Sequence, residues 1–285
     1  MAFVSRFEWQ PVVGSTNDVV AGWLRDGTAE VCVAVADEQL GGRGRAGRSW
    51  SAPPGAALLL SAGFRPSWLP APQAWRLSAA ISLAMADAAE AVVGLPPGTI
   101  RLKWPNDLVA EVEGRGPCKL AGVLGESVGL GTDDPRVVVG IGVNAGWSRA
   151  AFPPGLADTM TSLAELGGGL DGGLGAGAGR ANGVDRHALA DAFLARLEPL
   201  VEGLRAGRFA AAAWQARQVT SGRRIRLERP DGEVETVDAV GVDPETGALV
   251  VRDPAGPDAV RSVLVGEIRH VRVAAGEAVV AGDGV

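Results

Sequence analysis

Three arginines spaced by glycine and alanine occupy one short segment of this chain and could together bind an anion. Residues 42–48 read GRGRAGR. Each guanidinium presents a planar fork of donors that pairs with a carboxylate or a phosphate, and glycine lets the backbone approach a ligand closely. A solvated basic turn and an RNA-contacting segment are alternative interpretations. The apolar segments 31–36 and 56–60 on either side favour a loop presented by two buried strands, a common location for a binding site.

Two later segments add a turn and a lysine to this set. Residues 103–107 read KWPND, in which proline disfavours a helix and Asn-Asp favours a turn, so a tight corner between two strands is predicted. Lys119 directly precedes the apolar run LAGVL, and Gly122 within it permits close backbone approach. We therefore expect the Lys119 ammonium at the rim of a buried strand, although a lysine at a strand entrance is often simply solvated.

Polar residues near the N-terminus precede a segment with helical periodicity. Residues 14–18 read GSTND, and Ser15 followed three residues later by Asp18 fits a capping box, which predicts a helix start. Capping alone would account for these residues. Gln39 stands shortly before the arginine loop, and residues 140–144 read GIGVN.

The order of these segments resembles that of biotin–protein ligases, also called biotin–[acetyl-CoA-carboxylase] ligases. The resemblance rests on STN, Gln39 with GRGRAGR, KWPND, KLAG and GIGVN, and it covers most of residues 6–165. The C-terminal part resembles the family by its strand pattern alone. Each motif by itself is a weak signal, but the combination is specific. One departure is Leu40-Gly41, where we expect a polar or alanine pair.

The resemblance implies a two-step reaction. Biotin and MgATP form biotinyl-5′-AMP and pyrophosphate, and a lysine of a biotin carboxyl carrier protein then attacks the activated carboxyl group. The first step joins a carboxylate to an α-phosphate, so cations must surround both anions. The resemblance implies Lys119 and Arg45 as catalytic residues, with Lys119 between the two anions. A lipoate ligase or octanoyltransferase of the same superfold is the alternative enzyme.

The same resemblance assigns the binding residues. Those expected to bind biotin are Ser15, Thr16, Asn17, Gln39, Arg43, Lys119 and Gly122. Those expected to bind the adenylate are Arg45, Arg48, Trp50, Asn106 and Asn144, although a tryptophan after a loop is more often a core anchor. Mg²⁺ keeps mostly substrate oxygens and water as ligands, so its protein ligands stay unknown, with Asp107 as an indirect candidate that equally fits turn capping.

Composition restricts the class of protein. The 285 residues carry a formal net charge of −6, which argues against sequence-independent nucleic-acid binding. No stretch approaches the roughly 20 apolar residues of a membrane span, and no signal peptide is evident, which predicts a cytoplasmic protein without membrane contact. Cys32 and Cys118 are expected to be buried free thiols. His187 and His270 lie far from the motifs, so neither a histidine base nor a histidine-bound metal is expected.

Apolar periodicity predicts an α+β protein in which a mixed sheet with flanking helices is followed by a small SH3-like β-barrel. We expect a catalytic domain at 1–219, with a glycine-rich disordered insertion at 167–185, and the barrel at 220–285. Helices are predicted at about 16–25, 71–93 and 189–214. Strands are predicted up to residue 13 and at 31–36, 56–64, 100–104, 108–112, 120–128, 137–144, 224–228, 233–242, 248–252 and 259–263.

The expected partners follow from the family resemblance and from the position of its first motif in the chain. About a dozen residues precede Ser15, too few for a DNA-reading helix-turn-helix, so we expect a monofunctional ligase that does not bind DNA. A biotin carrier domain is the expected macromolecular partner. A monomer or a weak homodimer through a sheet edge is expected, and the barrel is either a stabilising cap or a docking element.

Overall fold

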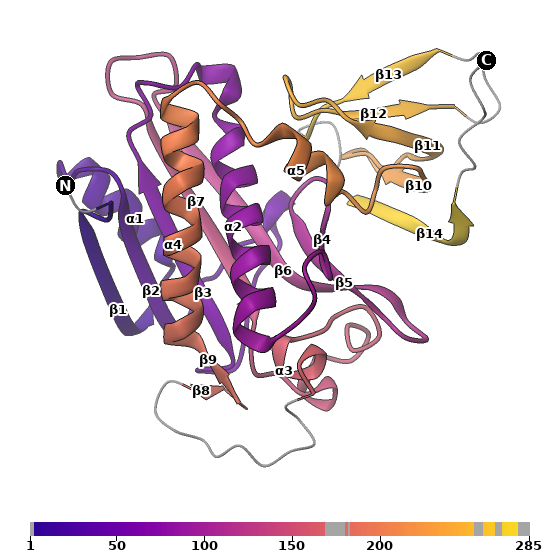
Figure 1. The fold of residues 1–285 in the computed structure, drawn as a ribbon, viewed down its shortest axis with the longest axis horizontal. Coiled ribbons are helices and arrows are strands. Elements are labelled where there is room, and N and C mark those ends of the chain that lie inside the picture. The colour runs from indigo at the N-terminus through magenta and orange to yellow at the C-terminus, as the bar shows by residue number, and fades with distance from the viewer. Residues whose placement is uncertain (1–2, 169–179, 182, 254–258, 266–269, 279–285) are drawn as a thin grey trace.

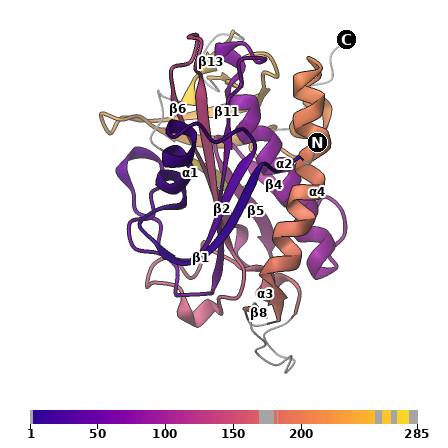
Figure 2. The ribbon, with the colours of Figure 1, turned by 90° about the vertical axis from the view of Figure 1, so that its left-hand side faces the viewer.

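The computed structural model describes residues 3–168, 180–181, 183–253, 259–265 and 270–278. It contains one large β-sheet, one small β-sheet and one two-stranded pair, with helices around them (Figure 1). Figure 2 shows the large sheet edge-on, with α1 (Thr16–Arg25) on one side and α2 (Trp75–Val93) and α4 (Arg186–Arg205) on the other. None of the helices in the described part of the chain combines the length and apolar composition that a membrane crossing requires.

The large sheet has seven strands in the order β1-β2-β3-β7-β6-β5-β4. Strands β1 and β2 are parallel because α1 connects them as a crossover, and the other neighbours are antiparallel. This confirms the predicted mixed sheet. The bounds are β1 Arg6–Val13, β2 Cys32–Gln39, β3 Ala57–Phe64, β4 Ile100–Lys103, β5 Asp107–Val112, β6 Gly116–Val128 and β7 Arg136–Asn144.

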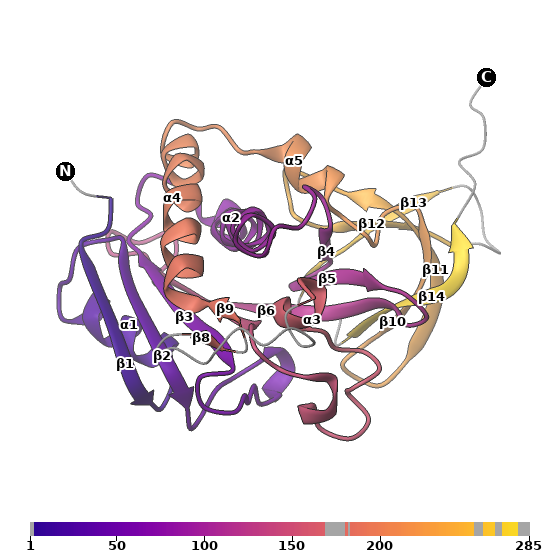
Figure 3. The ribbon, with the colours of Figure 1, turned by 60° about the horizontal axis from the view of Figure 1, so that its bottom comes forward.

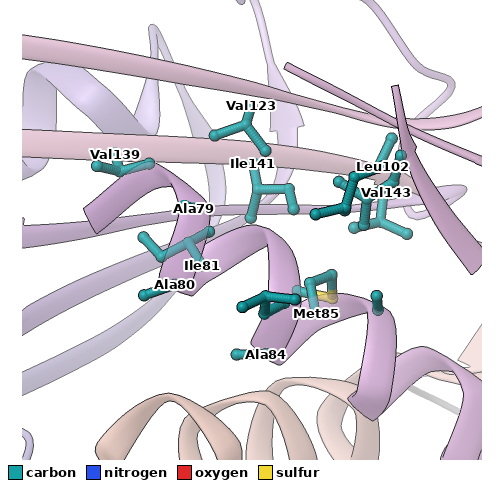
Figure 4. Packing of buried hydrophobic residues seen from close by; sticks show 14 of the residues in the cluster. Ala79, Ala80, Ile81, Ala84, Met85, Leu102, Val123, Val139, Ile141 and Val143 are labelled. Carbon is teal, nitrogen blue, oxygen red and sulfur yellow. The ribbon is translucent and has the colours of Figure 1, made fainter. Parts of the chain in front are cut away.

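The main core lies between this sheet and α2. Ile81 and Met85 of α2 fill the space between this helix and the sheet, while the small Ala80 and Ala84 lie on the side of α2 toward α4, where they let the two helices pack closely (Figure 4). Facing Ile81 and Met85 are Val123, Val139 and Ile141. The helix predicted from residue 71 begins at Trp75, because residues 71–73 form a separate 3₁₀ turn.

The small sheet is antiparallel, with the order β13-β12-β11-β10-β14. Its bounds are β10 Arg223–Glu228, β11 Val234–Val242, β12 Leu249–Arg252, β13 Val260–Val263 and β14 His270–Ala278. Sequence analysis missed β14. Among the described strands no ladder joins β13 to β14, so barrel closure stays a prediction. A short helix, α5 (Ala211–Ala216), lies between the end of α4 and this sheet (Figure 3).

Two predicted boundaries need correction. The helical stretch predicted at 189–214 is two helices, since α4 ends at Arg205 and a turn with Gly207 at φ 71° precedes α5. The predicted disordered insertion lies partly outside the described residues. Within it, however, β8 (Arg180–Ala181) pairs with β9 (Val184–Asp185), and Val184 is buried in the core. A short helix, α3 (Leu163–Leu166), precedes the insertion.

Both cysteines, Cys32 and Cys118, are buried and carry free thiols, as predicted. Burial raises the pKa of the Cys32 thiol to about 11, so this side chain is neutral and packs as an apolar group.

Candidate functional site

A cavity of about 1100 Å³ opens beside the large sheet and is lined by residues of both sheets. It brings together nearly all of the side chains that the sequence singled out: Ser15, Thr16, Asn17, Gln39, Arg43, Arg45, Arg48, Trp50, Asn106, Asp107, Lys119 and Gly122. Asn144 is not among the lining residues. It is buried, and its amide nitrogen donates to the carbonyl oxygen of Thr161 at 3.0 Å.

A chain of hydrogen-bonded polar side chains includes three residues of the cavity lining, Thr16, Asn17 and Gln39. The Gln39 Oε1 accepts from the backbone N–H of Thr16 at 2.7 Å and lies 3.0 Å from its hydroxyl. Ser61 Oγ lies 2.7 Å from Thr16 Oγ1 and 2.6 Å from Asn17 Oδ1, and the Asn17 amide nitrogen donates to Glu126 at 2.7 Å. Because every member has a partner, these side chains hold fixed orientations.

Sequence analysis missed Ser61 and Glu126, two members of this chain. Ser61 is fully buried in the otherwise apolar strand ALLLSAGF, and a lone hydroxyl among leucines was the available signal. Glu126 follows Gly122 and Leu124 at every second position of β6, a spacing that places all three on one face of the strand.

The predicted capping box at α1 is wrong. Ser15 occupies the N-cap position with extended backbone, but its side chain makes no capping hydrogen bond. Asp18 instead accepts two hydrogen bonds from Arg43, at 2.7 and 2.9 Å, and these bonds hold the pKa of its carboxyl below the usual range. The buried Ser15 side chain lines the cavity, so capping does not account for the serine.

The arginine loop is a tight turn in which the three guanidinium groups have different surroundings. Gly42 O accepts from Trp50 N at 2.9 Å, and Gly44 N donates to the Arg48 carbonyl oxygen at 2.7 Å. Arg43 points back to α1 and also reaches Glu126 at 3.2 Å. Its pKa is raised by these carboxylates.

Arg45 lies deeper in the cavity. Its Nη1 is 3.4 Å from Asn106 Oδ1, and its Nη2 donates at 2.9 Å to the carbonyl oxygen of Val265, beyond the end of β13. Burial lowers the pKa of Arg45 from its ordinary value. This arginine therefore connects the loop with the corner at 103–107 and with the smaller sheet.

A β-bulge in β6 directs Lys119 into the cavity. Val109 pairs with Lys119 while the preceding Leu108 pairs with Ala121, so Leu120 is an extra residue. Lys119 and Gly122 consequently face the same side, and Leu120 and Ala121 are both buried in the core. A Cβ on Gly122 would lie 3.1 Å from Lys119 Nζ, so only glycine leaves this space open.

Lys119 lies inside β6 rather than at its head, and its Nζ is 2.6 Å from Asp107 Oδ1. Asp107 is also 3.9 Å from Lys103 Nζ, and burial lowers the pKa of Lys103. Lysines that line a cavity beside one carboxylate can bind an anionic ligand through its negative oxygens. The corner at 103–107 has the predicted form, since it ends β4 and begins β5.

Trp50 lies against the sheet where glycines leave room for it. A Cβ on Gly142 would be 2.6 Å from its ring, and one on Gly122 would be 3.2 Å away. Lys119 Nζ lies 5.4 Å from the ring centroid, within the range of a cation–π contact. Trp50 is half-buried and lines the cavity, so it is not simply a core anchor.

The side chains that line the cavity could take a magnesium ion only if phosphate oxygens also bind the ion. Within the described residues, no three side chains of His, Cys, Asp or Glu gather in a way that could hold a metal ion. Asp107 offers a carboxylate at the cavity corner, but Lys119 and Lys103 already neutralise it. Such a site suits Mg²⁺ held chiefly by phosphate oxygens and water.

The sequence and the fold were compared with known proteins. Residues 9–144 match the biotin/lipoate A/B protein ligase family, and residues 220–280 match the biotin protein ligase C-terminal domain. A biotin–[acetyl-CoA-carboxylase] ligase of Mycobacterium tuberculosis is 34% identical over 264 residues, covering 91% of this chain and 86% of the relative. A biotin–[acetyl-CoA-carboxylase] ligase of Paracoccus denitrificans is 32% identical over 255 residues, covering 82% of this chain and 89% of the relative.

The fold is similar to that of a solved biotin protein ligase from Aquifex aeolicus in complex with biotin and ATP. The TM-score is 0.72 at 24% identity, and the alignment covers 94% of this chain and 99% of that chain. At this identity the likeness concerns the fold. The sequence relatives, together with the matched family models, show that the chain belongs to the biotin protein ligase family.

Proposed function

We propose that this chain activates biotin with ATP and transfers it to a lysine of a biotin carboxyl carrier protein. The observation that carries this function is one cavity lined by two chemically different sets of side chains. The first is the hydrogen-bonded polar chain of Thr16, Gln39 and Asn17, and the second is the cationic pair of Lys119 and Arg45. A neutral ureido ring needs the first, and a carboxylate meeting a phosphate needs the second.

In the first step, a biotin carboxylate oxygen attacks the α-phosphorus, and the bond from that phosphorus to pyrophosphate breaks. We assign Lys119 to hold the carboxylate and the α-phosphate, and Arg45 to stabilise the phosphate charge that builds in the transition state. Lys119 must then exchange its partner Asp107 for substrate oxygens. Asp107 would hold Mg²⁺ indirectly, through water, and the ion would offset the charge of the departing pyrophosphate.

In the second step, the carrier lysine amine attacks the carbonyl carbon of the mixed anhydride, and AMP leaves as an amide bond forms. We assign Ser15, Thr16, Asn17, Gln39, the backbone at Arg43, and Gly122 to biotin. Arg48, Trp50 and Asn106 are assigned to the adenylate. For Asn144 we propose an indirect role, since it binds the carbonyl oxygen of Thr161, the residue after the cavity-lining Met160.

We further propose that residues 1–219 form the catalytic domain and residues 220–285 a small C-terminal domain. The connection between α5 and β10 lies at this boundary, which supports the division. Two buried free thiols support a reducing compartment such as the cytoplasm. A monomer or weak dimer remains our expectation, and carrier docking beside the arginine loop is part of this proposal.

Two half-reactions test the function. Purified protein should catalyse biotin-dependent exchange of labelled pyrophosphate into ATP, and should then attach labelled biotin to a carrier domain. Lipoate, tested in parallel, should support neither reaction. Exchange with lipoate but not with biotin would contradict the proposal and favour the lipoate alternative.

A further inference from the structure

One wall of the cavity is a segment with little regular structure, residues 147–162. It follows β7, contains one 3₁₀ turn at Arg149–Ala151 and ends where α3 begins. Its side chains at Trp147, Leu156 and Met160 line the cavity. Its only backbone pairing with a strand in the described part of the chain is one isolated β-bridge between Met160 and Lys119, so it depends on side chains of other elements to satisfy its remaining backbone groups and to hold it in place.

Arg115, at the tip of the β5–β6 hairpin, supplies such contacts. Its Nη1 donates to the carbonyl oxygens of Ala157, at 2.9 Å, and Met160, at 3.0 Å, while its Nη2 pairs with Glu165. The Arg115 side chain is only 9% exposed. The Thr161 hydroxyl donates to the second Glu165 oxygen at 2.8 Å, so the carboxylate has a partner on each side. Partly buried, charge-assisted bonds of this kind are stronger than exposed ones.

The same part of the wall is attached to the backbone of Lys119. Lys119 N donates to the Thr159 carbonyl oxygen at 2.7 Å, and Thr161 N donates to the Lys119 carbonyl oxygen at 2.9 Å. The carbonyls that Arg115 binds lie on either side of Thr159. A shift of the wall would therefore move the apolar lining and disturb the strand position from which Lys119 reaches the cavity.

We propose that Arg115 is a positioning residue that fixes residues 156–160 against β6 and thereby retains the activated intermediate in the cavity. It acts through the carbonyls of Ala157 and Met160. This inference rests on the proposed function, because the retained species is the biotinyl adenylate. Without Arg115 the wall opens more often, and the adenylate escapes into water before transfer.

The test compares Arg115→Ala and Arg115→Lys with Arg149→Ala. Arg149 lies on the same segment and pairs with Asp158, but the two side chains are 56% and 78% exposed, so this pair contributes little. Labelled adenylate is formed on each protein from biotin and MgATP, and its release is followed after a chase with unlabelled biotin. Hydrogen exchange of residues 156–161 is measured separately without substrates.

Arg115→Ala should release the adenylate about tenfold faster or more, because several hydrogen bonds to a charged donor are lost. Its residues 156–161 should also exchange faster. Arg115→Lys should be intermediate, since an ammonium lacks the planar fork that spans two carbonyls and a carboxylate. Arg149→Ala should stay within about twofold of the wild type.

Adenylate release from Arg115→Ala at the wild-type rate would overturn the proposal, whatever the exchange data show. Equal acceleration in Arg149→Ala would also overturn it, by indicating general loosening of the segment. If Arg115→Ala does not fold, Arg115→Lys and Glu165→Gln decide by the same two measurements. Failure of the wild type to form any adenylate would instead contradict the proposed function, and hydrogen exchange would still report whether Arg115 holds the wall.

Discussion

Lys119 has a carboxylate partner that its proposed task requires it to exchange. Its Nζ lies 2.6 Å from Asp107 Oδ1, and its side chain is 30% exposed. A pair of this kind keeps the ammonium directed into the cavity, at a location where substrate oxygens can compete for it. Asp107 therefore orients the lysine toward the cavity.

Replacing Lys119 with alanine should abolish adenylate formation and leave the fold intact. Loss of one preorganised cation at the transition state typically costs on the order of 10²–10³ in rate. The measurement is biotin-dependent pyrophosphate exchange, with the thermal unfolding midpoint as a control for folding. Exchange within tenfold of the wild type would remove Lys119 from the catalytic role.

Gly142 tests whether the position of Trp50 matters for binding. A Cβ there would lie 2.6 Å from the Trp50 ring, so Gly142→Ala must displace the indole toward the ligand space. We expect biotinyl-5′-AMP to bind about tenfold more weakly or worse, as measured by calorimetric titration. Gly241→Ala is the matched control, because a Cβ there meets no atom within 4 Å and its φ is not in the left-handed region. Wild-type affinity in Gly142→Ala would show that the position of Trp50 does not matter for adenylate binding.

At the scale of elements, Glu90 connects α2 to β4, the strand that leads into the corner at 103–107. Its Oε1 accepts from the backbone N–H of Ile100 at 2.7 Å and from Arg217 at 2.9 Å. Arg217 in turn donates to the Ile100 carbonyl oxygen at 2.6 Å. Burial raises the pKa of Glu90, but the hydrogen bonds from Arg217 and the backbone outweigh it, and the net pKa is lowered.

Glu90→Ala should lower the free energy of unfolding by about 3 kcal/mol at neutral pH, because it leaves the Arg217 guanidinium largely buried without its main partner. Because folding lowers the pKa of Glu90, its carboxylate contributes its full stabilisation at pH values above the pKa of glutamate in the unfolded chain, about 4.3. This stabilisation is lost as the pH falls through the lower pKa of the folded protein. The difference between wild type and variant in urea unfolding should thus shrink at acidic pH. Glu8→Ala, which breaks an exposed pair with Arg6, should change little. A pH-independent difference would contradict this account.

Local signals predicted some elements well and others poorly. Helix α1 begins and ends where predicted, at Thr16 and Arg25, because its apolar periodicity and the turn before it are local. The bulge at Leu120 leaves no local signal, since it is defined by pairing with β5. The contacts of Arg115 also leave no local signal, because its partners lie about 40 to 50 residues away in the sequence. Ordered motifs thus located the charged and polar residues that carry the proposed chemistry, whereas the contacts that support the cavity are tertiary.

In the whole molecule, the smaller sheet packs against the corner at 103–107, which carries Asn106 and Asp107. Trp104, within that corner, is 2% exposed, and its indole Nε1 donates to the carbonyl oxygen of Gly247 at 3.0 Å. Its backbone N–H donates to the Thr220 hydroxyl at 3.1 Å. The turn at 243–247 also contacts α2, since Arg76 donates to the Pro244 carbonyl oxygen at 3.1 Å. The smaller sheet therefore supports the site from behind, and removing it would disturb the corner as well as any docking surface.

Two glycines of the smaller sheet separate this support from general stability. Gly247 and Gly232 both have positive φ, 73° and 91°, so alanine at either position incurs a backbone cost of about 1–2 kcal/mol. A Cβ on Gly247 would lie 2.7 Å from the Trp75 ring, whereas one on Gly232 meets no atom within 4 Å. We expect Gly247→Ala to move the turn away from Trp104 and to lower pyrophosphate exchange about tenfold, while Gly232→Ala keeps nearly wild-type exchange despite a similar backbone penalty. Pyrophosphate exchange should be measured at a temperature well below the unfolding midpoints of both variants. It then shows whether the smaller sheet supports the site or only stabilises the chain. Equal activity in the two variants would show that the smaller sheet stabilises the chain without shaping the site.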